Sequence, residues 1–72
     1  METSLVRRNP EIMSGALCFG GTRVPVQNLF DYLKGNSSLD DFLVDFPSIR
    51  REKAIAVLQA AMERLYADAP AA

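Results

Sequence analysis

Three basic side chains lie close together near residue 50 and are the first candidates for chemistry. They are Arg50, Arg51 and Lys53. An arginine can bind the edge of guanine through two hydrogen bonds, and either residue type can hold a phosphate. Ser38 is included with them as a candidate DNA contact. The plainer alternative is a solvated basic turn, and the carboxylates farther along the same segment, which DNA would repel, favour it.

Catalytic and metal chemistry find little support. Cys18 lies between two apolar residues in a chain without histidine, so we expect an inert buried thiol rather than a nucleophile. Asp40, Asp41 and Asp45 are better explained as acidic residues that complement the start of a helix than as metal ligands. The sequence therefore predicts no enzyme, no metal site, no cofactor and no small-molecule substrate.

The segment 20–23, Gly-Gly-Thr-Arg, resembles a phosphate-binding loop superficially. It lacks the lysine and the spacing of a P-loop. A tight turn that leads into a helix is the better interpretation.

Three helices are expected after this turn. The first spans about Val26 to Lys34, with Pro25 in its first turn and Gly35 placed as a left-handed cap. The second runs from Leu39 to Pro47, where the proline ends it, and Ser37 or Ser38 can cap its start.

The third helix is expected to be the longest. It should begin near the basic cluster and run to about Tyr66. Its apolar residues recur on one face. They are Ile55, Leu58, Met62 and Leu65, with Ala54 and Ala61 beside them. A short link between the second and third helices matches the spacing of a helix-turn-helix, whose later helix can lie in a DNA groove.

The residues before Val26 predict a short hairpin-like arm. Prolines and glycines exclude a long helix there but permit extended pieces around Leu5-Val6 and Leu17-Cys18-Phe19. A two-stranded ribbon is marginal in water, and its open edge invites pairing with another chain. The candidate dimer residues are therefore Leu5, Val6, Leu17 and Phe19.

Length and composition predict one small, soluble domain. The chain has 72 residues, 49% of them hydrophobic, and a single cysteine. Domains of this size usually need an additional source of stability, such as a disulfide, a bound metal ion or oligomerisation. A single cysteine and the absence of histidine exclude an internal disulfide and an ordinary zinc site, so oligomerisation remains. Without a signal peptide or an apolar run of about 18 residues, we expect a cytoplasmic protein. The net charge of −1 and the pI near 5.2 argue against a general nucleic-acid coat, so DNA binding requires a local patch.

A family resemblance is carried by an ordered set of motifs. They are Pro10-x-Ile12, Gly15, Gly21-Thr22-Arg23-Val24-Pro25-Val26, Leu33-Lys34-Gly35 and Phe46-Pro47-x-Ile49. Together they resemble the family called domain of unknown function 433, the VapB-like antitoxin proteins. The resemblance covers roughly Leu5 to Leu65. The chain departs from it at Leu17, where members commonly have proline, and at Arg50, where many have a threonine or serine cap.

The resemblance implies a mainly α fold with a three-helix, homeodomain-like helix-turn-helix core and a short N-terminal β arm. From the residues themselves we expect the arm and turn at 1–25, the three-helix core at 26–67 and a flexible tail at 68–72, where small residues and a proline predominate. The resemblance also implies an antitoxin that pairs as a homodimer with a PIN-like nuclease toxin and represses its own promoter DNA. The alternative is a protein-interaction module that keeps the helix-turn-helix shape without binding DNA, which the acidic pI favours.

Overall fold

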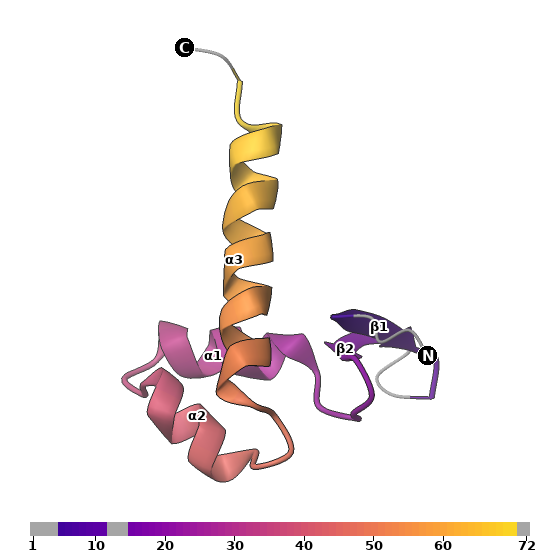
Figure 1. Cartoon of the computed structure of the whole chain (residues 1–72), viewed down its shortest axis with the longest axis vertical. Coiled ribbons are helices and arrows are strands. Elements are labelled where there is room, and N and C mark those ends of the chain that lie inside the picture. The colour runs from indigo at the N-terminus through magenta and orange to yellow at the C-terminus, as the bar shows by residue number, and fades with distance from the viewer. Residues whose placement is uncertain (1–4, 12–14, 71–72) are drawn as a thin grey trace.

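A computed structural model describes residues 5–11 and 15–70. Two strands precede three helices, in the order β1 (Val6–Asn9), β2 (Ala16–Phe19), α1 (Val26–Lys34), α2 (Leu39–Asp45) and α3 (Arg51–Asp68). The expected hairpin and three helices are confirmed, with α3 the longest (Figure 1). Ile12 and the last two residues of the expected tail lie outside the described residues. No helix in the described part has the length and apolar composition needed to cross a membrane.

The arm is an antiparallel hairpin that continues into a tight turn. Val6 lies opposite Phe19, and Asn9 lies opposite Ala16. In the turn that follows β2, Gly21 has a φ of 77°, in the left-handed region that favours glycine. The hydroxyl of Thr22 donates to the carbonyl oxygen of Phe19 at 2.9 Å and accepts from the amide of Val24 at 3.1 Å. The interpretation of residues 20–23 as a turn into α1 is confirmed.

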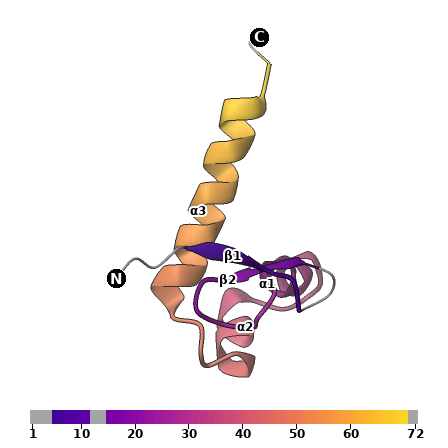
Figure 2. The same ribbon diagram turned by 90° about the vertical axis from the view of Figure 1, so that its right-hand side faces the viewer.

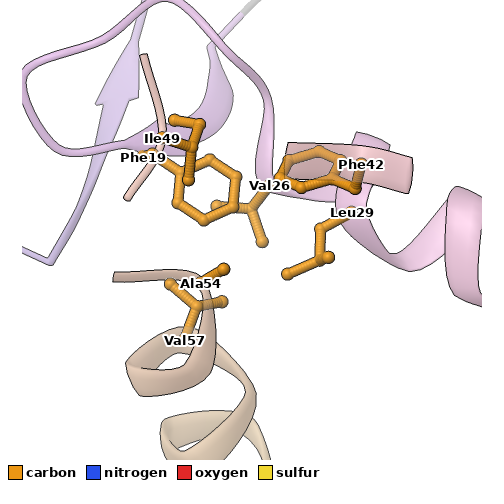
Figure 3. Packing of buried hydrophobic residues seen from close by; sticks show 7 residues of the cluster. All are labelled: Phe19, Val26, Leu29, Phe42, Ile49, Ala54 and Val57. Atoms are coloured by element: carbon orange, nitrogen blue, oxygen red, sulfur yellow. The ribbon is translucent and has the colours of Figure 1, made fainter. Parts of the chain in front are cut away.

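The core lies where the hairpin meets the three helices. Its buried residues are Phe19, Val26, Leu29, Phe42, Ile49, Ala54 and Val57 (Figure 3). The rings of Phe19 and Phe42 lie 5.8 Å apart between centroids, and Tyr32 and Phe46 extend this aromatic group. Aromatic pairs at this spacing add to the stabilisation that comes from burial alone. The core therefore holds β2 to α1 and α2 and to the first turns of α3.

Local signals set the bounds of α2. The hydroxyl of Ser38 accepts from the amide of Asp41, and the carboxylate of Asp41 accepts from the amide of Ser38. This reciprocal capping box satisfies two donors that the first turn leaves free. Phe46, which precedes Pro47, leaves helical geometry with φ −124° and ψ 73°. The predicted serine cap and proline stop are both confirmed.

The prediction of a left-handed cap at Gly35 is wrong. Gly35 has a φ of −85° and a ψ of −151°, and its amide donates to the carbonyl oxygen of Asp31 at 3.1 Å. The backbone leaves α1 in an extended conformation, and the amide of Gly35 is satisfied there without a positive φ.

The predicted apolar face of α3 does not form the core contact as a whole. Ala54 and Val57 are the buried residues of this helix, whereas Ile55 is 48% exposed, Met62 44% and Leu65 70%. The physical reason is visible in both views: α3 rises from the layer formed by the hairpin, α1 and α2, and its second half projects beyond the other described elements (Figures 1 and 2). Small residues face the core where the helix crosses it.

Candidate nucleic-acid interface

Two hollows adjoin each other where the hairpin meets the start of α3. The first has a volume of about 450 Å³ and is lined by Arg7, Arg8, Asn9, Pro10, Glu11, Gly21, Thr22 and Arg23. The second has a volume of about 590 Å³ and is lined by Gly20, Gly21, Thr22, Ser48, Arg50, Glu52 and Lys53. Because both include Gly21 and Thr22, the turn after β2 is their common wall. We call the combined surface the basic hollow.

The basic hollow concentrates positive charge in an acidic chain. Its lining includes four arginines and one lysine against two glutamates, a net charge of +3. The whole chain carries −1, so the remainder carries −4. Nearby like charges reinforce one another's potential and attract phosphate. This is the local patch that the overall composition requires for any nucleic-acid binding.

Lys53 joins the two sides of the basic hollow. Its ammonium donates to the carbonyl oxygen of Gly20 at 3.0 Å, and the contact is partly buried. The side chain therefore holds the turn after β2 against α3. Its charge stays in the hollow, but one of its hydrogen-bond donors is already used within the chain.

Arg50 occupies the N-cap position of α3. It has extended geometry and makes no capping hydrogen bond with its side chain, which confirms the expected loss of a cap there. Arg50 is exposed and lines the hollow. A positive side chain at this end of the helix dipole is unfavourable unless an anion is near.

Arg51 and Ser38 do not line the basic hollow. Arg51 forms an ion pair with Asp40 of α2, and both side chains are more than half exposed. Such a pair contributes little to stability and can exchange for another anion. Ser38 is engaged in the capping box of α2. Of the four residues predicted to contact DNA, the structure thus brings Arg50 and Lys53 together.

The predicted dimer residues of the arm are unequally available. Leu5 and Val6 are partly buried against the core, and Phe19 is fully buried within it. Leu17 is 39% exposed. The ring of Phe19 therefore serves this chain's own core, and Leu17 is the member that offers an apolar side chain to a partner.

Three arginines of the basic hollow were not predicted as site residues. Arg7 and Arg8 lie on β1, and Arg23 lies in the turn that precedes α1. The guanidinium of Arg8 also donates to the carbonyl oxygen of Gly15 at 2.9 Å. Their signal in the sequence was a pair of adjacent arginines in an expected strand. Their distance from residue 50 along the chain hid the connection.

Negative charge gathers mainly on α2, whose sequence contains three aspartates and no basic residue, whereas Asp31 of α1 is paired with Lys34. Asp31, Asp40, Asp41 and Asp45 are exposed on these two helices, and we call this surface the acidic face. The hydroxyl of Tyr32 donates to the carboxylate of Asp45 at 2.5 Å. This hydrogen bond, with smaller effects from burial and from the charges of Asp45 and Asp41, raises the pKa of Tyr32 above its ordinary value of 10.0. The phenol therefore stays protonated as part of the contact between α1 and α2.

Neither Cys18 nor the aspartates form a metal-binding group in the described residues. Cys18 is buried and its thiol lies 3.7 Å from the carbonyl oxygen of Ala16. Within residues 5–11 and 15–70, no group of three or more histidine, cysteine, aspartate or glutamate side chains is placed to hold an ion.

Comparison with known proteins gives one match. The model of the family described as "Protein of unknown function (DUF433)" matches residues 6–60, which include the hairpin, α1, α2 and the part of α3 that contacts the core. No curated protein and no solved structure matches the chain. Because the match spans well over half of the 72 residues, the chain belongs to the DUF433 family of proteins of unknown function.

Proposed function

We propose that this protein is an antitoxin-like regulator that binds DNA through the basic hollow as a cytoplasmic homodimer. The carrying observation is a net charge of +3 gathered in the basic hollow, between the hairpin and the start of α3, in a chain whose net charge is −1. In a helix-turn-helix, the N-terminal residues of the later helix contact base edges. Here that helix is α3, joined to α2 by residues 46–50.

The hollow suits a phosphate backbone beside a base edge. Arg50 has the exposed position at the start of α3 from which a guanidinium reaches into a groove. Arg7 and Arg23 come from the hairpin and the turn, where they can contact phosphates on the same strand of the duplex. The proposal therefore divides the roles, with base contact from Arg50 and backbone contact from the hairpin.

A protein toxin is assigned to a different surface. The acidic face on α1 and α2 has the charge that complements the basic cleft of a nuclease, such as a PIN-like toxin. A bound antitoxin would act by occlusion, since it would cover the cleft that binds RNA or DNA. No catalytic role is proposed for this chain.

The test is fluorescence anisotropy of the purified protein on DNA from upstream of its own gene, against a scrambled duplex, across a salt series. We expect tighter binding to the upstream duplex and a steep salt dependence. Each lost phosphate contact lowers the slope of log affinity against log salt by about 0.9. The double variant Arg7→Ala/Arg23→Ala should reduce the slope by up to about two. Arg50→Ala/Arg51→Ala should instead lower the affinity for the upstream duplex and its preference over the scrambled duplex.

The matched control is Lys34→Ala with Arg64→Ala. These side chains form exposed ion pairs within α1 and α3 and do not line the hollow. The control removes the same charge and should leave most of the affinity. If the control lost as much DNA affinity as the hollow variants, the loss would be explained by net charge alone, and the basic hollow would be rejected as the binding site.

A protein-interaction module without DNA binding is the second candidate. It is favoured by the engagement of Arg51 with Asp40 and of Lys53 with Gly20, which uses two of the predicted DNA contacts inside the chain. This candidate predicts equal, weak binding to both duplexes even at low salt. It also predicts that a basic protein is retained through the acidic face and released by the double variant Asp41→Asn/Asp45→Asn.

A further inference from the structure

An apolar seam runs along α3 from its core contact into its projecting half: Leu58 is partly buried against the core, whereas Ile55, Met62 and Leu65 are exposed. The seam consists of Ile55, Leu58, Met62 and Leu65, which recur at alternating intervals of three and four residues. This is the spacing that places side chains in one line along a helix that packs against another helix. Tyr66, 79% exposed, lies beside it. Of the exposed large hydrophobic residues, Ile55, Met62, Leu65 and Tyr66 all belong to α3.

The dimensions of the chain show how much surface is left uncovered. Its radius of gyration is 13.1 Å, against about 11 Å for a compact domain of this length. Its accessible surface is 5485 Å², against about 4,400 Å² for a compact monomer of 7.9 kDa. The excess of roughly 1,100 Å² exceeds the 800 Å² or so that one partner buries in a standard interface. This excess is that of the whole chain, and the exposed side chains of Ile55, Met62, Leu65 and Tyr66 show that α3 contributes to it.

The charges along α3 favour a second copy in one orientation. The start of the helix, with Arg50, Arg51 and Lys53 against Glu52, carries +2. Its end, with Glu63 and Asp68 against Arg64, carries −1. Antiparallel packing sets the positive start of one helix against the negative end of the other, and it also opposes the two helix dipoles. Parallel packing would align like charges.

We propose that two copies of this chain associate through an antiparallel pair of α3 helices that packs along the seam. The inference deepens the proposed function, because it names the surface through which the proposed homodimer forms. It rests on the proposed function only for the expectation that the protein is a homodimer. It also moves the dimer contact away from the hairpin. There, Phe19 belongs to the core and Leu17 is the exposed apolar residue of the predicted four.

Sedimentation equilibrium of the full chain over a concentration series tests the surface. The wild type should approach twice the mass of one 7.9 kDa chain. Leu65→Glu should weaken self-association at least 100-fold, because a carboxylate would be buried in the seam. The matched control Ala60→Glu adds the same charge at an exposed position on the opposite side of α3 and should leave the dimer intact.

The same experiment decides between α3 and the hairpin. Leu17→Glu should leave the dimer intact, because Leu17 lies on β2 and outside the seam. Circular dichroism of each variant checks that the helices persist, which the exposure of Leu65 and Leu17 leads us to expect. A monomeric wild type, a dimer that survives Leu65→Glu, or a dimer that dissociates with Leu17→Glu instead would each overturn the proposal.

Pulsed electron paramagnetic resonance tests the orientation. Nitroxide labels are placed one at a time through Glu52→Cys, Gln59→Cys and Ala67→Cys, while Cys18 stays buried and unlabelled in the native protein. In an antiparallel pair the separation of like labels changes by about 3 Å for each residue along the helix, because each copy contributes a rise of 1.5 Å. The same separation at all three positions would indicate parallel helices and contradict the proposal.

The dimer and the DNA proposals fail separately. A wild type that binds upstream DNA but remains a monomer contradicts the seam and leaves the basic hollow in place. A wild-type dimer that is dissociated by Leu65→Glu but binds neither duplex supports the seam and contradicts the DNA proposal.

Discussion

Lys53 on α3 donates a hydrogen bond to the carbonyl oxygen of Gly20, 33 residues earlier in the chain, at 3.0 Å. The contact joins the turn after β2 to the start of α3 and so gives the basic hollow its two walls. A residue expected to contact DNA therefore has a structural role as well. Arg51 also contacts another helix, through its ion pair with Asp40, but that pair is exposed and contributes little to stability.

Replacement of Lys53 should destabilise the protein as well as reduce its charge. Lys53→Ala removes a partly buried hydrogen bond from a charged donor, and we expect the free energy of unfolding to fall by about 1 kcal/mol. Urea denaturation followed by circular dichroism measures the change. Lys34→Ala is the control, since its ion pair is exposed and should contribute little. Equal stability of Lys53→Ala and the wild type would remove the structural role.

The cap of α2 gives a prediction with a neighbouring control. Ser38→Ala breaks the capping box with Asp41 and should cost about 1 kcal/mol of unfolding free energy. Ser37→Ala, one position earlier and outside the helix, should change it by less than about 0.5 kcal/mol. If both serines gave the same urea midpoint shift, the cap would not be the cause.

A cap can be added to α3. Arg50→Ser places a hydroxyl at an N-cap position whose present side chain makes no capping bond. We expect Arg50→Ser to be about 1 kcal/mol more stable than Arg50→Ala, which removes the same charge without adding a cap. Both variants should bind DNA more weakly than the wild type. Stability and DNA binding would then change in opposite directions at one residue, as expected where a binding role has replaced a cap.

Tyr32 predicts a change at alkaline pH. Its pKa is raised in the folded protein by the hydrogen bond to Asp45, so the stabilisation is present below the ordinary tyrosine pKa of 10.0 and is lost as pH rises through the folded value. The difference in absorbance at 295 nm between the wild type and Tyr32→Phe reports ionisation of Tyr32, and we expect the midpoint of its titration above pH 10.0. A difference curve with its midpoint at or below 10.0 would show that the hydrogen bond does not hold the phenol protonated.

Short-range signals determined most of the secondary structure from the sequence alone. The first helix was predicted at Val26 to Lys34 and is found there. Ser38 and Pro47 marked the start and the end of α2 correctly, because a cap and a proline act on the backbone within a few residues. Gly35 is the exception, because its amide donates to the carbonyl oxygen of Asp31 without a left-handed backbone conformation.

Only the tertiary structure decided which side chains meet. Periodicity placed Ile55 and Leu65 on one face of α3, but it does not reveal how far a helix extends beyond its core, and these residues are exposed. Likewise, no spacing along the chain connects Arg7 and Arg23 with Arg50. They line adjoining hollows because the hairpin packs against the core and the turn after β2 meets the start of α3. Local propensity acts over a few residues, whereas a surface is assembled from segments that packing brings together.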